Sequence, residues 1–500
     1  MIGDVPLFIR ADANWKIGMG HIMRCLALAQ AWHNHGGKAV FITQCDSTAL
    51  KQRLMDEGCE VVELKDCYPD KRDLAQTLSV SDSYPGSWLV LDGYHFDSEY
   101  QQQIKKTGHQ LLVIDDMANL DYYYADIVLN QNIYAEQLEY NCEPYTKLLL
   151  GTRYVLLRRE FLKWQGYKQD IPEVAKKILV TMGGSDPDNV TLKVLNALEI
   201  IDIPALEVVA VLGPSNQNKE ILQREADTSP VNIRLAENPE DMPSLMAWAD
   251  LAITAGGSTV WELAYMGVPA LVLVLAPNQQ KNAVYLEKKG SVLNLGTAND
   301  LRMDALCSKL KKLVSDQKTL TSVANMGRKL VDGLGNIRVL TNILGAELWL
   351  RDVLQDDCEL IWRWANDPEV RAVSFSSDYI SYDEHKKWFD KKLRDPECIF
   401  WIAMDEEDKP FGQVRFDARQ NGSVDISISL GKEYRGQNYG SILLDIAVER
   451  LFNTTTKKEV HAYIKPENVR SIRAFEKARF KWLGMKEING CLSMHYVRYK

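Results

Sequence analysis

Short apolar runs alternate with segments of helical period through the first 345 residues of the chain. The run LFIRA at residues 7–11 is typical of a buried strand, and residues 21–35 place apolar side chains at helical spacing. Two further apolar runs, at residues 87–92 and 109–115, flank another helical segment. Because parallel strands need long crossover connections, this alternation predicts an α/β fold built on parallel sheets.

The alternation is interrupted by a polar stretch near residues 164–176. It resumes with a strand-like run, a glycine turn and a helix start within residues 176–189, and it continues to about residue 345. We therefore predict two Rossmann-like lobes, residues 1–165 and 175–345. Ligands of such open sheets bind outside the carboxyl ends of the strands, so we expect the site in a cleft between the lobes.

From residue 349 onward the pattern changes. Residues 399–417 and 422–431 alternate apolar and polar positions around turn signals, as antiparallel strands do. Residues 441–452 form an amphipathic helical segment soon after them. The pattern predicts a separate α+β domain over residues 349–500.

Composition narrows the classes of function. The chain of 500 residues is 46% hydrophobic and 25% charged, as expected of a globular protein with substantial cores. Its formal net charge of -9 argues against a nucleic-acid partner, and its longest strongly apolar stretch, residues 268–277, is too short to span a membrane. The nine cysteines lack C-x-x-C spacing and no signal-peptide pattern is visible, so we expect a cytoplasmic protein with reduced thiols. The sequence defines no oligomeric state.

The strongest chemical signal before residue 345 is a glycine turn between a strand and a helix. Gly256 and Gly257 let the backbone approach a ligand closely, and Ser258 opens a helix whose free N–H groups suit a diphosphate. Glu262, one turn further, is placed to accept hydrogen bonds from ribose hydroxyls. The alternative is an ordinary strand–helix turn in which Glu262 complements the helix dipole.

A second candidate is His21, in the stretch IRADANWKIGMGHIMRC. It follows Gly18 and Gly20 at the junction of a predicted strand and helix, where a neutral imidazole could take a proton from water. The alternative is a plain helix-start residue after a tight turn. The stretch SDPDN at residues 185–189 could be a D-x-D metal motif, but Ser and Asp after a glycine turn are standard helix caps, so we predict no metal there.

The first 345 residues resemble the UDP-sugar hydrolases of the pseudaminic acid pathway in four motifs, which occur in the order IRADANWKIGMGHIMRCLALAQ, VLDGYHFD, VTMGGSDPDN and ITAGGSTVWELAYMGVPALVLVLAPNQQKN. The resemblance covers about residues 5–345 and implies the two-lobed fold of GT-B glycosyltransferases. It also implies that His21 is the catalytic base of a hydrolysis without a metal. The substrate contacts it implies are Arg10, Asp12, Gly20, Tyr94, Gly183, Gly184, Ser185, Gly256, Gly257, Ser258, Glu262 and Asn278.

The third region contains a loop suited to a pyrophosphate. Residues 435–440, RGQNYG, link a predicted strand to a helix and offer consecutive backbone N–H groups. Together with the segment PENVRSIRAFEKARFKWLG, the loop resembles the GNAT acetyltransferases, and the resemblance covers about residues 349–500. It implies acetyl-CoA as co-substrate, held by Arg435, Gly436, Gln437, Asn438, Tyr439, Gly440, Asn468, Ser471 and Phe475.

Two positions depart from the GNAT pattern. Phe475 stands where many members carry a Tyr that protonates the leaving thiolate, and a Phe has no proton to donate, so the general acid is open. Arg479 replaces the usual glycine after a predicted helix, which predicts a different helix end. The alternative for the whole segment is a structural strand–turn–helix that binds no cofactor.

The two resemblances together imply a bifunctional enzyme whose partners are UDP-sugars and acetyl-CoA. The C-terminal domain is expected to N-acetylate the 4-amino group of UDP-4-amino-4,6-dideoxy-N-acetyl-β-L-altrosamine. The N-terminal lobes are expected to hydrolyse UDP-2,4-diacetamido-2,4,6-trideoxy-β-L-altropyranose to the free sugar and UDP. Two alternatives stay open: a GT-B glycosyltransferase fused to an acetyltransferase, and a non-catalytic UDP-sugar sensor that regulates the acetyltransferase.

Overall fold

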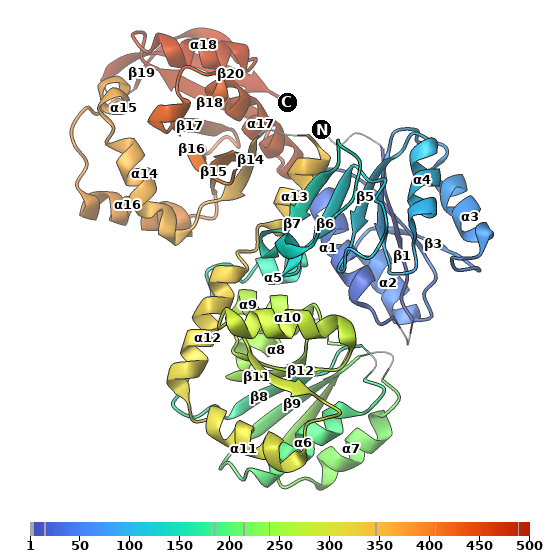
Figure 1. The fold of residues 1–500 in the computed structure, drawn as a ribbon. Helices are drawn as coiled ribbons and strands as arrows, with labels where there is room; N and C mark the ends of the chain where they lie inside the picture. Colours follow the sequence, from blue (N-terminus) through green and yellow to red (C-terminus); the bar gives the residue numbers. More distant parts are fainter. Residues whose placement is uncertain are drawn as a thin grey trace. The chain divides into compact units, whose positions relative to one another are not determined.

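The structure, a computed structural model, describes residues 5–14, 17–184, 186–213, 216–239, 241–345, 348–405, 407–488 and 490–500. Its elements form two compact units, Met1–Ile343 and Leu344–Lys500 (Figure 1). The predicted fold class is confirmed, because the first unit contains two parallel Rossmann-like sheets and the second an α+β fold.

The first lobe is a parallel sheet with the order β3-β2-β1-β4-β5-β6-β7. Both of its faces are covered, because Leu7 and Ile9 pack in one cluster with the first helix while Phe8 packs in another with Tyr100 and Ile104. The strands are β1 (Leu7–Ala11), β2 (Ala39–Thr43), β3 (Glu60–Glu63), β4 (Trp88–Asp92), β5 (Gln110–Ile114), β6 (Ile127–Asn130) and β7 (Lys147–Leu150). The helices are α1 (Gly20–Asn34), α2 (Thr48–Asp56), α3 (Lys71–Ser81), α4 (Ser98–Lys106) and α5 (Arg159–Leu162).

The strand order of this lobe reverses beside β1, which pairs with β2 on one side and β4 on the other. Ala11 and Asp92, the last residues of β1 and β4, lie in register. A crevice forms at such a switch point, because the connections from the two strands leave in opposite directions. The residues that follow β1 and β4 are thereby placed around a binding site.

The second lobe repeats this design with the order β10-β9-β8-β11-β12-β13. The strand order reverses between β8 and β11, so the glycine turns that follow these two strands open at the same edge of the sheet. The strands are β8 (Lys177–Thr181), β9 (Glu207–Leu212), β10 (Asn232–Glu237), β11 (Leu251–Ala255), β12 (Ala270–Val274) and β13 (Leu293–Thr297). The helices are α6 (Val190–Ile200), α7 (Lys219–Thr228), α8 (Met242–Trp248), α9 (Thr259–Met266), α10 (Pro277–Lys288), α11 (Met303–Leu313) and α12 (Gln317–Leu330).

The last helix of the first unit, α13 (Gly335–Ile343), returns from the second lobe to the first (Figure 1). Its residues Val339, Leu340 and Ile343 are buried in the same hydrophobic cluster as α1. At the start of α13, the Asn336 side-chain amide donates hydrogen bonds to the carbonyl oxygens of Ala27 at 3.0 Å and of Leu157 at 2.8 Å. The first lobe is therefore completed by a segment that lies far away in the sequence.

The second unit is a mixed sheet with the order β14-β15-β16-β17-β18-β20-β19, in which only the β17–β18 pair is parallel within the described residues. Its strands are β14 (Leu348–Asp352), β15 (Cys398–Asp405), β16 (Pro410–Ala418), β17 (Val424–Leu430), β18 (Glu459–Ile464), β19 (Lys481–Ile488) and β20 (Cys491–Tyr499). Its helices are α14 (Cys358–Ala365), α15 (Pro368–Val373), α16 (Tyr382–Arg394), α17 (Tyr439–Thr454) and α18 (Val469–Lys477).

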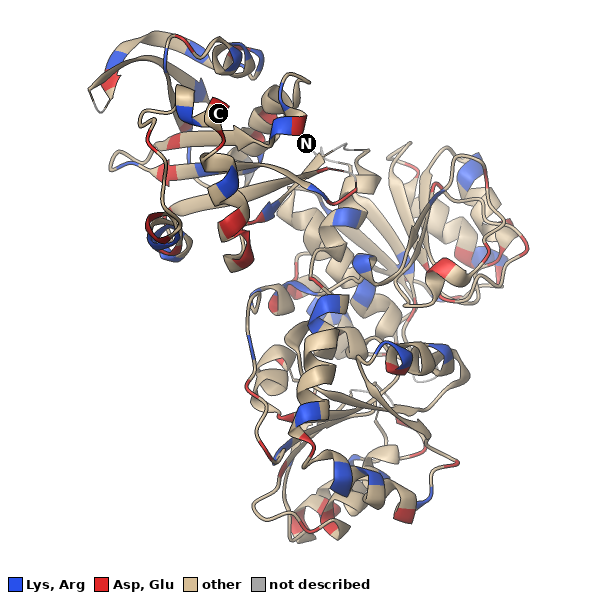
Figure 2. Ribbon diagram, turned by 60° about the vertical axis from the view of Figure 1, so that its left-hand side comes forward, with Lys and Arg blue, Asp and Glu red and all other residues tan. Residues whose placement is uncertain are grey.

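Charged residues of both signs are interspersed along the helices of each unit, whereas the strands are mostly uncharged (Figure 2). This is the distribution expected when each sheet is buried between helices whose outer faces meet water. Within the described part of the chain, no helix combines the length and apolarity that crossing a membrane would require.

Candidate active sites

A cleft of about 1180 Å³ opens between the two lobes of the first unit. Its walls come from the start of α1 and the loops after β4 and β5 on one side, and from the turns after β8, β11 and β12 on the other. A cavity of this size is large enough for a ligand with several rings and phosphates. Most of the predicted substrate-binding residues line it, namely Gly20, Tyr94, Gly183, Gly184, Gly256, Gly257, Ser258, Glu262 and Asn278.

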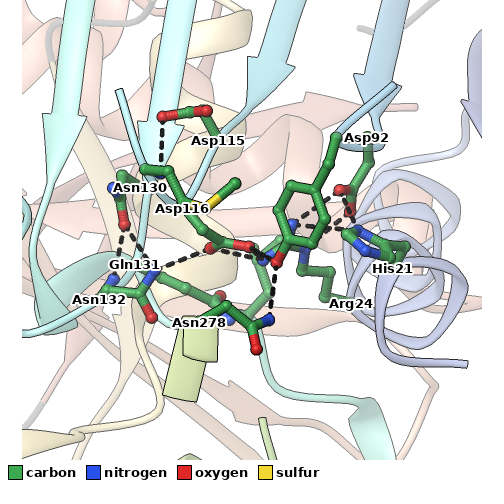
Figure 3. Close-up of polar contacts among 12 residues, drawn as sticks. His21, Arg24, Asp92, Asp115, Asp116, Asn130, Gln131, Asn132 and Asn278 are labelled. Carbon is green, nitrogen blue, oxygen red and sulfur yellow. Dashed lines mark hydrogen bonds and ion pairs between the residues drawn. The ribbon is translucent and has the colours of Figure 1, made fainter. Parts of the chain in front are cut away.

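His21 lies in the first turn of α1 and lines the cleft. Its Nδ1 atom is 2.6 Å from Oδ1 of Asp92, the last residue of β4, and both side chains are almost fully buried (Figure 3). Within the described part of the chain, Nε2 of His21 makes no hydrogen bond. The pair therefore has the geometry of a general base whose tautomer is set by a carboxylate and whose second nitrogen remains for a water molecule.

Arg24, one turn after His21 on α1, joins two carboxylates behind this pair (Figure 3). Its Nε and Nη2 donate to Asp92 at 2.6 and 2.7 Å, and its Nη1 donates to Asp116 at 2.9 and 3.0 Å. Asp116 also accepts a hydrogen bond from the side-chain amide of Asn132 at 2.8 Å. The rotamer of Asp92 is thus held from two directions.

Both carboxylates are ionised at working pH. Burial alone would raise the pKa of Asp92, but the charges and hydrogen bonds of Arg24 and His21 hold it well below its usual range. The pKa of Asp116 is likewise lowered, because Arg24 outweighs the effect of burial. Two carboxylates against one guanidinium leave an excess negative charge, which stabilises the imidazolium formed when His21 accepts a proton.

Tyr94 and Asn278 meet across the cleft. The hydroxyl of Tyr94 donates to Asp116 at 2.7 Å and accepts a hydrogen bond from the amide of Asn278 at 3.4 Å. The Tyr94 ring stands edge-on to His21, with ring centroids 4.9 Å apart. A ligand bound beside His21 would therefore contact groups from both lobes.

The N-terminus of α9 is an open anion site at the opposite wall. The backbone N–H of Gly256 is taken by the side chain of Gln279 at 3.1 Å, but those of Gly257, Ser258 and Thr259 make no hydrogen bond within the described residues. A Cβ on Gly20 would lie 3.9 Å from Oγ of Ser258, so the starts of α1 and α9 are neighbours. Unpaired N–H groups and the helix dipole favour a phosphate here. This position is next to Gly20, the residue that precedes His21.

The corresponding turn after β8 is already capped. Asp186 accepts hydrogen bonds from the backbone N–H groups of Val190 at 2.8 Å and Thr191 at 2.9 Å, so it acts as the cap of α6 rather than as a free metal ligand. Gly183 and Gly184 line the cleft beside this cap. Ser185, the remaining predicted contact of this turn, lies outside the described residues.

Glu262 faces the cleft from α9 and is held by Arg158. Nη2 of Arg158 donates to Oε1 of Glu262 at 2.8 Å, across the boundary between the lobes. Because the described part of the chain leaves Oε2 of Glu262 without a hydrogen bond, that oxygen is available to a ligand hydroxyl. Glu262 therefore remains a proposed ribose contact, now with a fixed orientation.

Arg10 and Asp12, which the sequence analysis placed among the substrate contacts, do not line the cleft. Arg10 is fully buried and forms ion pairs with Asp12 and with Asp73 of α3. The reason is that Arg10 points to the α3 side of the sheet, whereas the cleft is built by residues beyond the end of β1. This correction removes both residues from the substrate-binding set.

Sequence reasoning missed Asp92, Arg24 and Asp116. Asp92 and Asp116 stand at or just after the carboxyl ends of β4 and β5, and Arg24 is three residues from His21 on the same face of α1. The rule that ligands bind at strand carboxyl ends, applied to every strand, would have pointed to both aspartates. The spacing of His21 and Arg24 would have placed those two side chains together.

In the second unit, the parallel strands β17 and β18 separate after two residue pairs. The register pairs only Val424 with Val460 and Asp425 with His461, so the rest of β17 lacks a partner on that side within the described residues. A gap of this kind exposes backbone N–H and C=O groups to an extended ligand, which can add as a further strand. It opens beside the loop 435–440.

The loop 435–440 contains two residues in the left-handed region and leads directly into α17. Gly436 has φ 80° and Asn438 has φ 67°, both in the left-handed region, and α17 starts at Tyr439. The side chain of Arg435 donates to the carbonyl oxygen of Leu430 and to Asp367, while Gln437 donates to the carbonyl oxygen of Glu433. These side chains shape the loop, which leaves its backbone to contact a ligand.

The other predicted cofactor residues lie on or next to this turn and on α18. A Cβ on Gly440 would lie 3.7 Å from Ala474, so the start of α17 lies beside the C-terminal half of α18. Asn468 caps α18 by accepting from the backbone N–H of Ser471 at 3.1 Å, and Phe475 is buried against Phe480 with ring centroids 4.9 Å apart. All of them remain proposed cofactor contacts.

Arg479 occupies the position after α18 where the GNAT pattern has a glycine, and it adopts the backbone conformation of that glycine. It adopts φ 64°, the left-handed conformation that glycine would take, and its guanidinium pairs with Asp445 and Glu449 at 2.5 and 2.9 Å. The expected change of helix end is therefore not seen, because α18 stops at Lys477 and the chain turns as it would at a glycine.

Two family models match the chain. The model of the glycosyltransferase family 28 C-terminal domain matches residues 178–333, and the model of the acetyltransferase (GNAT) domain matches residues 347–481. The first match covers the lobe that carries the open α9 N-terminus, and the second covers the gap between β17 and β18 and the loop 435–440.

Three curated relatives extend these matches. An uncharacterized protein of Methanocaldococcus jannaschii is 24% identical over 95% of this chain and 97% of its own length. The spore coat polysaccharide biosynthesis protein SpsG of Bacillus subtilis is 29% identical over 66% of this chain and 95% of its own length. The UDP-2,4-diacetamido-2,4,6-trideoxy-β-L-altropyranose hydrolase of Campylobacter jejuni is 27% identical over 57% of this chain and 97% of its own length.

The predicted resemblance is confirmed by these findings. The chain is therefore similar to a hydrolase over its first unit and to acetyltransferases over its second. Among solved structures, the aminoglycoside acetyltransferase AAC(6')-Ib in complex with coenzyme A is similar at 20% identity with a TM-score of 0.28, over 31% of this chain and 95% of that one.

Proposed function

We propose that this chain catalyses two steps on one nucleotide sugar. Its C-terminal domain transfers an acetyl group from acetyl-CoA to the 4-amino group of UDP-4-amino-4,6-dideoxy-N-acetyl-β-L-altrosamine. Its N-terminal lobes then hydrolyse the resulting UDP-2,4-diacetamido-2,4,6-trideoxy-β-L-altropyranose to UDP and the free sugar. The observation that carries the hydrolysis is the His21–Asp92 pair beside the open N-terminus of α9, together with the named activity of the Campylobacter relative.

The hydrolytic step follows from this geometry. Nε2 of His21 takes a proton from a water molecule as the water oxygen attacks the anomeric carbon, and Asp92 stabilises the imidazolium. The bond between the anomeric carbon and the diphosphate oxygen breaks, and its electron pair leaves with UDP. The N–H groups at the start of α9 donate hydrogen bonds to the leaving diphosphate and stabilise its negative charge.

The acetyl transfer is assigned to the gap between β17 and β18. The pantetheine arm of acetyl-CoA would pair with the free edge of β17, and the pyrophosphate would lie over the loop 435–440 at the start of α17. The substrate amine would then attack the thioester carbonyl directly. The C–S bond breaks as the N–C bond forms, CoA leaves as the thiolate, and the amine proton passes to water. The product of acetyl transfer is the substrate of hydrolysis, so its high local concentration gives a reason for joining the two domains in one chain.

Two other functions make different predictions. A GT-B glycosyltransferase needs an acceptor before it releases UDP, and a UDP-sugar sensor binds UDP-sugar without releasing UDP. The deciding experiment is to incubate the protein with the UDP-amino sugar and acetyl-CoA and to follow the sugar by NMR. Acetylation at the 4-amino group followed by UDP and free sugar supports the proposal, and the NMR couplings report the configuration of the sugar. Accumulation of the acetylated UDP-sugar without release of UDP contradicts it.

Phe475 provides a test of the acetyl-CoA site. Phe475→Leu is expected to raise the KM for acetyl-CoA about fivefold, equivalent to about 1 kcal/mol of lost apolar contact, while Phe475→Tyr should keep acetyl transfer. The control is Phe452→Leu, which removes a buried ring from α17 in the same core. Steady-state kinetics should show the rise in KM for Phe475→Leu alone. Acetyl transfer in Phe475→Tyr combined with none in the wild type would instead identify an inactive acetyltransferase.

The two units are expected to fold and act separately. The hydrophobic clusters of the described residues draw either on residues up to Ile343 or on residues from Leu348 onward, and none mixes the two. Fragments 1–343 and 344–500 should therefore unfold cooperatively and retain hydrolysis and acetyl transfer respectively. A fragment 1–333, which lacks α13 and so exposes the α1 cluster, should be insoluble or much less stable. Loss of folding in fragment 1–343 itself would contradict the assignment.

A further inference from the structure

Three side chains of metal-binding type meet at the carboxyl edge of the first sheet, outside the cleft. Asp12 follows β1, Cys67 follows β3 and His95 follows β4, so they come from three separate loops. One ligand atom from each, Oδ2 of Asp12, Sγ of Cys67 and Nε2 of His95, lies within 4.8 Å of the other two. None of these residues lines the cleft.

The distances between these atoms are those of one face of a tetrahedron. Sγ of Cys67 is 3.4 Å from Oδ2 of Asp12 and 3.9 Å from Nε2 of His95, and that nitrogen is 3.1 Å from the same Oδ2. Bond lengths of about 2.3 Å to sulfur and about 2.0 Å to nitrogen and oxygen place the ligands of tetrahedral Zn²⁺ roughly 3.3–3.6 Å apart. A Zn²⁺ ion would therefore fit after shifts of a few tenths of an ångström.

The contacts around Asp12 leave the required oxygen free. Oδ1 of Asp12 accepts from the backbone N–H of Gln44 at 2.7 Å and from Arg10, which together fix the carboxylate plane. Oδ2 is then directed at Cys67 and His95. Metal ligands in proteins are commonly oriented by such outer hydrogen bonds, so the carboxylate is already positioned to bind a cation.

The charge of this region also favours a cation. Arg10 lies between Asp12 and Asp73, and all three side chains are at most 1% exposed, which leaves two buried carboxylates against one guanidinium. A Zn²⁺ ion bound by a Cys67 thiolate and a neutral His95 would bring the net charge of the group to zero. A protonated His95 would also neutralise it, and that is the competing explanation.

We propose that Asp12, Cys67 and His95 bind a Zn²⁺ ion, with water as the fourth ligand. The ion would join the loops after β1, β3 and β4, and it would hold His95 next to Tyr94, whose hydroxyl reaches Asp116 in the cleft. It is a structural ion outside the hydrolytic chemistry. No metal was predicted from the sequence, where the stretch SDPDN was interpreted as a helix cap. Asp12, Cys67 and His95 are far apart in the chain and form no recognisable spacing.

The experiment uses the full-length protein with its metal removed by a chelator and then titrated with Co²⁺, a spectroscopic substitute for Zn²⁺. Saturation at one Co²⁺ per chain with a thiolate-to-cobalt charge-transfer band is expected. Cys67→Ser should abolish the band, and His95→Gln should weaken binding at least about a hundredfold, the upper end for loss of an outer contact. Cys142→Ser, a partly buried cysteine of the same lobe, should leave both unchanged.

A second measurement needs no variant. X-ray absorption of the wild-type protein loaded with Zn²⁺ should show one sulfur and otherwise nitrogen and oxygen neighbours, and Zn²⁺ should raise the melting temperature of the first unit. The proposal is overturned if the stripped protein binds neither ion, or if Cys67→Ser keeps the charge-transfer band. It is also overturned if the absorption spectrum shows no sulfur, since His95 would then act as a protonated partner of Asp12 alone.

Discussion

His21→Ala is expected to lower the rate of UDP release from the UDP-sugar at least about a hundredfold, the lower end for loss of a general base. The variant removes the imidazole, whose Nε2 is the proposed proton acceptor in the cleft. It leaves the N-terminus of α9 intact. Because binding of the diphosphate is retained, the loss should appear in kcat rather than in KM. The measurement is steady-state release of UDP at saturating substrate.

Two controls accompany this variant. Acetyl transfer should be unchanged, because it belongs to the other unit. His33→Ala removes a histidine from the opposite end of α1, and its UDP release should stay within about twofold of the wild type, as expected away from the chemistry. A His21→Ala protein that releases UDP at the wild-type rate would refute the role of His21, and it would favour a base supplied by another residue of the cleft.

The fold was largely predictable because the spacing of apolar residues along the chain shows which faces of strands and helices are buried. Strands such as β1 are buried on both faces and therefore appear as continuous apolar runs between helical segments. The return of α13 to the first lobe was not predictable in this way. Its apolar face is clear from the sequence, but its partner α1 lies about 300 residues earlier, and local pattern does not say which helix it will meet.

Residues of the candidate hydrolytic site were predicted only where they lie in a recognisable sequence motif. His21, Tyr94 and Asn278 came from the resemblance, and the cap role of the SDPDN stretch came from turn chemistry, as Asp186 shows. Asp92 and Asp116 could have been selected as residues at strand ends, but their meeting with His21 depends on the strand order β1-β4-β5, which a single sequence does not reveal. Arg10 was misassigned for the same reason, since a charged residue in a fully buried strand can face either side and its partner Asp73 lies on α3.

Asp92→Asn is expected to lower kcat for UDP release by about 10²- to 10⁴-fold, the range between loss of proton-transfer assistance and loss of the carboxylate of a catalytic triad. The shape of the side chain is kept. The negative charge that stabilises the His21 imidazolium is removed, and the amide no longer selects the tautomer that leaves Nε2 as the acceptor. Asp115→Asn is the matched control, because Asp115 follows β5, is buried, and does not line the cleft.

The pH dependence of stability separates this catalytic effect from a structural one. The pKa of Asp92 is well below its usual range in the folded state, because Arg24 and His21 overcome the effect of burial. Its stabilising contribution is therefore fully present above the unfolded pKa of about 3.9 and is lost as the pH falls toward the folded pKa. Thermal unfolding should show a constant difference between wild type and Asp92→Asn at neutral pH, and the difference should shrink below about pH 4. A loss of kcat that merely followed the unfolded fraction of Asp92→Asn would contradict the catalytic role of this carboxylate.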